Sequence, residues 1–151
     1  MTEGEKAHPV LLYDGVCGLC NRTVQLVIKR DRSEVFRFAA LQGALGHRIL
    51  ERHGANPSDL DTFYVVLDFN AALPIEAEQN ETLLARSDAM SFVLCELGGV
   101  WRLLGGLFRL LPQTTRDWMY NLVAHRRYRV FGRYDSCPLP SEKDRRRFLD
   151  V

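Results

Sequence analysis

A short apolar run that passes directly into a helical pattern limits most strongly how this chain can fold. Residues 10–13 read Val-Leu-Leu-Tyr, and Asp14-Gly15 gives a turn signal directly after them. Apolar side chains then recur at helical spacing from Val16 to about Arg30. The apolar run predicts a buried strand, and the following pattern predicts an amphipathic helix against it. The chain therefore opens with a strand–turn–helix unit.

Further along the chain, strand and helix patterns keep alternating. The predicted strands are 35–40, 62–67 and 81–85, and the predicted helices are 41–53, 88–97, 100–111 and 115–128. Gly54 is expected to end the second helix, and Ser87 is expected to cap the third. Strand–helix–strand alternation predicts an α/β sandwich with parallel pairing in its first half, followed by additional C-terminal helices.

Composition places the chain among ordinary globular domains. Of its 151 residues, 46% are apolar and 26% are charged, and the net charge is +1. This length predicts one domain, and near-neutrality gives no overall attraction for nucleic acid. We expect a flexible N-terminal tail over 1–9, a single domain over 10–140 and a charged C-terminal tail over 141–151.

Two further features bear on location. Four cysteines are too few for a secreted disulfide scaffold, which favours a reducing compartment and a cytoplasmic protein. The most apolar long stretch, 89–112, contains Glu96, Arg102 and Arg109. A membrane span needs about 20 nearly uncharged residues, so this stretch predicts buried helix and no membrane insertion.

A Cys-x-x-Cys pair lies where the first strand meets the first helix, in the order Cys17-Gly18-Leu19-Cys20. Two intervening residues place the sulfurs one helical turn apart, within reach of a disulfide. The first sulfur stands at a helix N-terminus, where unpaired N–H groups and a partial positive charge favour an anion. The position therefore favours a low-pKa thiolate, which is the nucleophile in disulfide exchange.

This arrangement predicts a thiol-disulfide oxidoreductase. Cys17 would attack a substrate disulfide, and Cys20 would resolve the mixed disulfide and leave a Cys17–Cys20 bond. Asp14 is the acid nearest in sequence, and we expect it either to accept the proton of Cys20 or to tune both thiols. A purely local role for Asp14 in the turn or helix cap is equally consistent with its position. No cofactor is expected, because the dithiol itself carries the electrons.

The same cysteine spacing serves other sites. A c-type haem requires His directly after the second cysteine, where this chain has Asn21. A structural zinc bound by Cys17, Cys20, Cys137 and His125 remains an alternative. The chain would then be a non-enzymatic protein-binding module with a structural or redox-sensing dithiol.

The sequence also resembles a known family. The Asp14-x-x-Cys17-x-x-Cys20 signature, with Tyr13 and Gly15, is similar to that of the DCC family of predicted thiol-disulfide oxidoreductases. The similarity continues in Phe38–Gln42, Leu84–Ala89, Leu97–Gly99, Arg127–Gly132 and Cys137-Pro138. The resemblance implies a thioredoxin-like fold, dithiol chemistry at the two cysteines, and a disulfide- or dithiol-bearing protein or small thiol as partner.

One feature departs from ordinary thioredoxins. Those proteins carry a cis-proline before the third strand, where this chain reads Leu60-Asp61-Thr62. The family resemblance therefore does not imply that partners dock as an added strand beside the third strand.

Several other residues have two interpretations. Cys137 is a candidate third thiol or a turn residue, and Tyr13, Ser87 and Asp88 are candidate accessory residues. Cys95 lies among apolar residues and is expected to be buried. Apolar residues between 101 and 120 form either core or a dimer or partner surface. Arginines after residue 125 are expected to form a solvated face or tail, with an acidic partner as the alternative and no nucleic acid bound.

Overall fold

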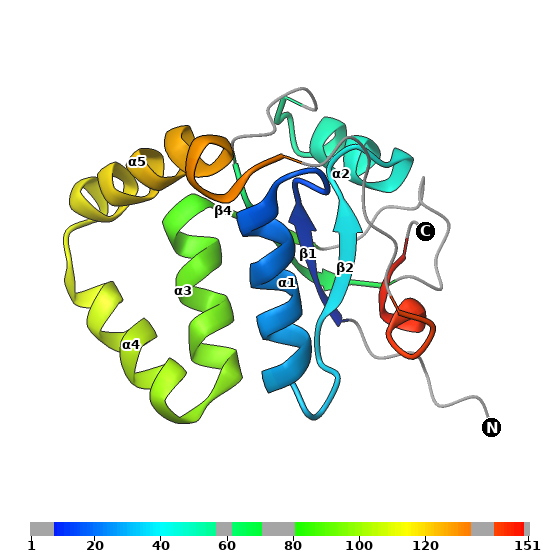
Figure 1. The fold of residues 1–151 in the computed structure, drawn as a ribbon, viewed down its shortest axis with the longest axis horizontal. Coiled ribbons are helices and arrows are strands. Elements are labelled where there is room, and N and C mark those ends of the chain that lie inside the picture. The colour runs from blue at the N-terminus through cyan, green and yellow to red at the C-terminus, as the bar shows by residue number, and fades with distance from the viewer. Residues whose placement is uncertain (1–7, 57–61, 71–80, 134–140, 150–151) are drawn as a thin grey trace.

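The computed structural model describes residues 8–56, 62–70, 81–133 and 141–149, and a four-stranded mixed sheet lies at its centre (Figure 1). Its strands are β1 (His8–Tyr13), β2 (Arg37–Ala40), β3 (Tyr64–Phe69) and β4 (Thr82–Ala85). The spatial order is β2-β1-β3-β4, with β1 parallel to β2 and antiparallel to β3, and β3 antiparallel to β4. This is a thioredoxin-like α/β fold, as the sequence predicts.

Alternate residues of the strands serve two separate cores. Helices α1 (Gly18–Arg30) and α3 (Arg86–Leu97) lie on one face of the sheet, and α2 (Ala44–Arg52) lies on the other (Figure 1). Leu11 and Val65 enter the core on the α1 side, whereas Val10 and Val66 enter the core on the α2 side. This period of two is why the central strands carry continuous apolar runs.

Two additional helices follow the sheet domain, α4 (Gly99–Leu110) and α5 (Gln113–Phe131). Gly98 and Gly99 both have positive φ, which lets the chain reverse from α3 into α4. α4 packs closely on α3, since a Cβ on Gly105 would lie 3.0 Å from the Cys95 sulfur. No helix among the described residues is both long and apolar enough to cross a membrane.

The end of α5 returns to the start of α1. The Gly18 N–H donates to the Gly132 carbonyl at 3.1 Å, and Cys17 forms an isolated antiparallel bridge with Arg133. A Cβ on Gly18 would lie 2.2 Å from the Phe131 carbonyl oxygen. Glycine therefore permits the close approach that brings α5 over the Cys-x-x-Cys turn.

Within 141–149, Arg147, Phe148 and Leu149 pack against the sheet, which differs from the expected charged tail, whereas most of the residues before them are exposed. A short 3-10 helix spans Arg145–Arg147, and the Arg147 guanidinium is buried beside Asp31 at 2.5 Å. The Phe148 ring lies against Phe38 with 5.2 Å between centroids, and the Leu149 N–H donates to the Phe38 carbonyl. Charge density along the sequence does not reveal that one arginine of the run has a buried partner.

Other element ends also differ from the predictions. α3 begins at Arg86, so Ser87 is inside the helix and not its N-cap. Its hydroxyl instead donates to Asp117 of α5 at 2.5 Å. The third strand is shifted by two residues and includes Asp68 and Phe69. Thr62 is buried, and no peptide bond in the described ranges is cis.

The contact between α1 and α5 predicts a position-specific effect of adding one methyl group. Gly18→Ala should lower the free energy of unfolding by about 1–3 kcal/mol, because the backbone of Phe131 must move. Gly106→Ala in α4 is the matched control, since its Cβ would meet nothing within 4 Å. That variant should be neutral or more stable by about 0.5–1 kcal/mol. Urea denaturation measures both; equal stability of the two variants would contradict this packing.

Candidate functional site

The turn between β1 and α1 places both cysteines at the start of the helix. Cys17 is the N-cap residue of α1, and its sulfur accepts a hydrogen bond from the Cys20 backbone N–H at 3.4 Å. The Cys17 N–H donates to the Asp14 carbonyl, and the Val16 N–H donates to the Asp14 carboxylate at 3.1 Å. The Cys17 sulfur thus occupies the place of a capping oxygen, at the positive end of the helix.

The two thiols differ in exposure. Cys17 has no exposed surface, and the Gly132–Arg133 segment lies beside its backbone. Cys20 is half-buried, and its side chain lines a cavity. In this conformation the accessible side of the pair is the side on which Cys20 lies.

The thiols also differ in acidity. A hydrogen bond from the Cys20 side chain, helped by backbone N–H groups and the charge of Arg127, lowers the pKa of Cys17 to about 6 despite its burial. The same side-chain bond, together with burial and the negative charge of Cys17, raises the pKa of Cys20 well above its usual range. At neutral pH the pair therefore holds one proton, on Cys20, and one negative charge, on Cys17.

Asp14 is buried at the centre of a hydrogen-bond network. One carboxylate oxygen accepts from the Arg127 guanidinium at 3.1 Å and from the Tyr128 hydroxyl, and the other accepts from the Gln42 amide at 2.6 Å. Gln42 also accepts from the Gly15 N–H at 3.0 Å. Burial and the bond to Asp14 raise the pKa of Tyr128 to about 12, so its hydroxyl stays a donor. Asp14 thus joins the Cys-x-x-Cys turn to the loop after β2 and to α5.

The network bears on the three roles considered for Asp14. Its bond to the Val16 N–H is the local turn interaction. Within the described residues, its carboxylate bonds to Arg127, Tyr128 and Gln42 and not to the Cys20 thiol. Its negative charge nevertheless contributes to the raised pKa of Cys20. This geometry supports tuning through charge and positioning.

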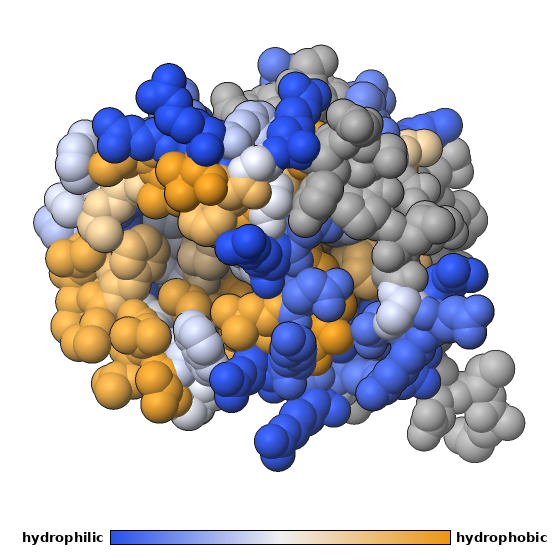
Figure 2. Space-filling view, viewed as in Figure 1, coloured by the Kyte–Doolittle hydropathy of each residue, from blue (hydrophilic) through white to orange (hydrophobic). Residues whose placement is uncertain are grey.

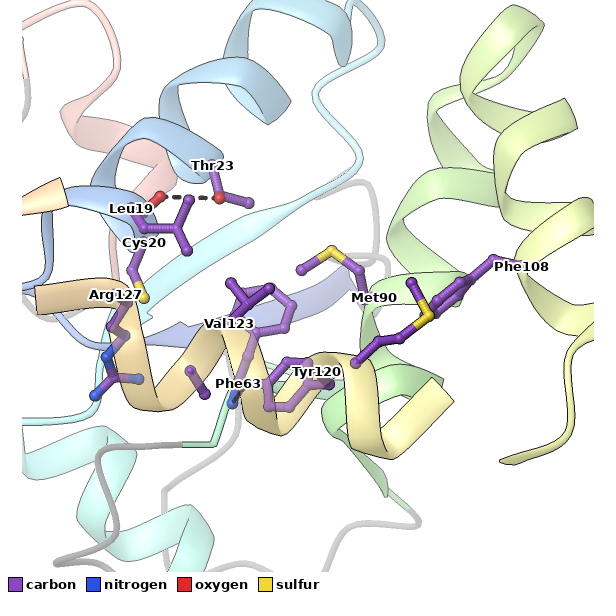
Figure 3. A pocket seen from close by; sticks show the side chains of 11 residues that line it. Leu19, Cys20, Thr23, Phe63, Met90, Phe108, Tyr120, Val123 and Arg127 are labelled. Atoms are coloured by element: carbon purple, nitrogen blue, oxygen red, sulfur yellow. Dashed lines mark hydrogen bonds between the residues drawn. The ribbon is translucent and has the colours of Figure 1, made fainter. Parts of the chain in front are cut away.

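A cavity of about 240 Å³ lies between α1, α3, α4 and α5, with Cys20 in its wall (Figure 3). Cys20 lies at the end beside Arg127, and Phe108 lies at the opposite end (Figure 3). Its wall is largely apolar, and the other lining residues are Leu19, Thr23, Phe63, Met90, Met119, Tyr120, Val123 and Ala124.

The candidate accessory residues occupy other places. Ser87 and Asp88 bond to Asp117 and Arg116 of α5, and Asp88 lines a different cavity. The Tyr13 ring is buried edge-on against Phe148, with 6.4 Å between centroids. Cys95 is partly buried in α3. Cys137 lies outside the described residues.

Three residues of the network were not assigned to the site from the sequence: Gln42, Arg127 and Tyr128. The family-like segments Phe38–Gln42 and Arg127–Gly132 contain all three, and this was the available signal. The sequence pattern groups Arg127 with the solvated arginines, whereas its side chain is buried in the structure. As for metal, the ranges described contain no group of three or more His, Cys, Asp or Glu arranged to hold an ion.

The acidity of Cys17 predicts a specific response to removing its hydrogen-bond donor. Cys20→Ala should raise the pKa of Cys17 from about 6 toward the ordinary thiol value of about 8.5. Ultraviolet thiolate absorbance, followed against pH, measures the midpoint of the first deprotonation. Cys95→Ala, in α3, is the control and should leave that midpoint in place. An unchanged midpoint in Cys20→Ala would show that the thiol bond does not set the acidity.

Comparison with known proteins identifies the family of this chain. The family model described as DCC1-like thiol-disulfide oxidoreductase matches residues 11–133. The uncharacterized protein YuxK of Bacillus subtilis (strain 168) is 36% identical over 149 residues, covering 99% of both chains. The DCC family protein At1g52590, chloroplastic, of Arabidopsis thaliana is 33% identical over 135 residues, covering 89% of this chain and 72% of its own. No solved structure gives a significant match. The chain belongs to the DCC1-like thiol-disulfide oxidoreductase family.

Proposed function

We propose that this protein exchanges disulfides with a partner through the Cys17–Cys20 dithiol. The observation that carries the proposal is the acidic Cys17 sulfur, one helical turn from Cys20 and bonded to the Cys20 N–H at 3.4 Å. A thiolate with a pKa near 6 is ionised at neutral pH and also leaves readily from a disulfide. The family description supports thiol-disulfide chemistry in general terms. We also propose that the substrate is a disulfide-bearing partner and that the protein acts in the cytoplasm.

In the proposed reaction, the buried Cys17 sulfur must first become accessible from the Cys20 side. Its thiolate then attacks one sulfur of a substrate disulfide. A Cys17–substrate bond forms, the substrate disulfide breaks, and the other substrate sulfur leaves as a thiolate. Cys20 then attacks Cys17, which forms the intramolecular disulfide and releases the second substrate sulfur. The substrate gains two electrons and the dithiol loses two; the proton of Cys20 goes to a released thiolate.

The second step requires Cys20 to lose its proton. In the free dithiol, the largest causes of its raised pKa include the bond to Cys17 and the negative charge on Cys17. Both disappear when the Cys17 sulfur is bonded to substrate. Arg127, whose charge lowers the pKa of Cys20, remains in place. The first step therefore activates Cys20 for the second.

Asp14 acts in this proposal as a tuning and positioning residue. It holds the Arg127 guanidinium at 3.1 Å, and both side chains are almost fully buried. Its own negative charge opposes a thiolate nearby, whereas the charge of Arg127 favours one. The balance of these two charges sets how strongly the reduced form is stabilised.

A redox titration tests the reaction itself. In glutathione buffers, the protein should form the Cys17–Cys20 disulfide reversibly in a two-electron step, because the two sulfurs are neighbours on one helical turn. Mass spectrometry identifies the bonded cysteines. Cys17→Ser should abolish the step, and Cys95→Ser should leave it unchanged. Two results together would contradict the proposal: no disulfide forms under strongly oxidising buffer, and the protein holds stoichiometric zinc that is lost in Cys20→Ser. The protein would then be a binding module with a zinc-bound dithiol and not an oxidoreductase.

The tuning role predicts the sign of a change in reduction potential. Asp14→Asn removes a negative charge that raises the pKa of Cys20, so the reduced dithiol should become more acidic. The reduced form gains stability, and the potential should become less negative by about 30 mV for each pKa unit. Asp88→Asn is the control, because Asp88 is an exposed carboxylate that pairs with Arg116 at 3.4 Å. This variant should leave the potential unchanged. A more negative potential in Asp14→Asn would contradict the assignment.

A further inference from the structure

The cavity beside Cys20 offers a ligand almost no polar contact. Its few polar side chains already bond within the protein: Thr23 donates to the Leu19 carbonyl at 2.9 Å, and Tyr120 accepts from the Phe63 N–H at 2.7 Å. Arg127 is paired with Asp14. The open walls are formed by Phe108, Met119, Val123 and their apolar neighbours (Figure 3). Whatever part of a substrate lies here is apolar.

The size of the cavity suits one large side chain. A protein cavity of about 150 Å³ binds benzene. The volume of about 240 Å³ therefore accommodates an aromatic ring or a branched aliphatic side chain with room to enter. Since Cys20 is in the wall and Cys17 is buried behind it, a group held here lies next to the reacting sulfurs.

The cavity opens onto a larger apolar surface. Every strongly exposed large apolar side chain of the described residues falls between 100 and 130, and the space-filling view shows this area over α4 and α5, hollowed between them (Figure 2). We define the α4–α5 apolar surface as Val100, Leu103, Leu104, Leu107, Leu110, Leu111, Trp118, Met119, Leu122 and Val123. Met119 and Val123 belong to both surface and cavity. A small molecule in the cavity would leave most of this surface in water, whereas a protein segment would cover it.

The charge around this surface selects among apolar partners. Residues 98–133 contain seven arginines and a single acid, Asp117. The exposed arginines are Arg102, Arg109, Arg126, Arg129 and Arg133. In a symmetric dimer through this face, the basic surface of one copy would meet the same surface of the other. A partner with acidic residues near its apolar ones is complementary.

We propose that the disulfide partner is a protein segment with an aromatic or large aliphatic residue beside its reactive cysteine and with acidic residues nearby. The apolar residue enters the cavity next to Cys20, and the rest of the segment lies on the α4–α5 apolar surface. This proposal rests on the proposed exchange reaction and names its substrate class.

The test uses short peptides, each with one cysteine linked to glutathione as a mixed disulfide. The reduced protein converts to its Cys17–Cys20 disulfide and releases one peptide thiol and one glutathione, both quantified by chromatography. Three peptides differ only near the cysteine. The first has Phe beside the cysteine and Glu on either side, the second has Ser in place of Phe, and the third has Lys in place of Glu. The Phe/Glu peptide should react about tenfold or more faster than the Ser/Glu peptide, because it buries one large apolar side chain. It should also react faster than the Phe/Lys peptide at low salt, with the difference shrinking as salt is added.

Two variants on α5 locate the effect. Val123→Glu places a carboxylate at the cavity wall and should reduce the Phe-over-Ser rate ratio to near one. Val130→Glu makes the same chemical change at a residue that is 66% exposed and outside the cavity, and it should leave the ratio unchanged. Both positions are at least half exposed, so both variants are expected to fold. Equal ratios in the two variants would show that the cavity does not hold the side chain.

The outcomes separate this inference from the function on which it rests. If all peptides react at one rate, the substrate class is wrong and disulfide exchange stands. If no peptide reacts and no Cys17–Cys20 disulfide forms, both fall. Vesicles of phosphatidylcholine with phosphatidylglycerol provide a third arm. Binding to them that is lost in Leu107→Glu, with no preference among peptides, would assign the α4–α5 apolar surface to a membrane and overturn the proposal.

Discussion

The buried ion pair between Asp14 and Arg127 is the interaction on which the site depends. Two opposite charges are held at 3.1 Å with almost no exposed surface, and the Tyr128 hydroxyl and Gln42 amide complete the bonding of the carboxylate. Removing one partner of such a pair costs about 3–5 kcal/mol, because the other charge is left buried and uncompensated. The pair is thus a strong constraint on which surface of α5 faces the β1–α1 turn.

From this constraint follow both the shape and the electrostatics of the dithiol. With α5 held against Asp14, its C-terminal end reaches Gly18 and lies over the buried Cys17. Arg127 adds a positive charge near both sulfurs, and the helix terminus supplies backbone donors. The thioredoxin-like sheet alone would place the cysteines, but the additional helix determines which sulfur is exposed and how the single proton is shared.

Sequence patterns predicted what depends on neighbours along the chain. The strand and helix periods fixed the sheet elements to within a few residues, and the Cys17–Cys20 spacing pointed to the helix N-terminus. Arg127 lies 113 residues from Asp14, so no local pattern distinguishes it from the exposed arginines beside it. The same holds for Arg147 with Asp31 and for Ser87 with Asp117. Each is a polar residue whose partner comes from another element, and composition alone favours solvent or a local cap for it.

The helical spacing of Leu104, Leu107 and Leu111 does not distinguish core from partner surface, since both require one continuous apolar face. The structure separates them physically. Gly105 and Trp101 turn the other side of α4 toward α3 and α1. This packing leaves Leu104 and Leu111 partly exposed, and Leu103, Leu107 and Leu110 more than half exposed. An apolar face that the fold itself does not cover is costly in water, and here it adjoins the cavity that leads to Cys20. The additional helices therefore do two things at once: one side of α5 carries the charge that tunes the thiols, and the α4–α5 apolar surface shapes the approach to them.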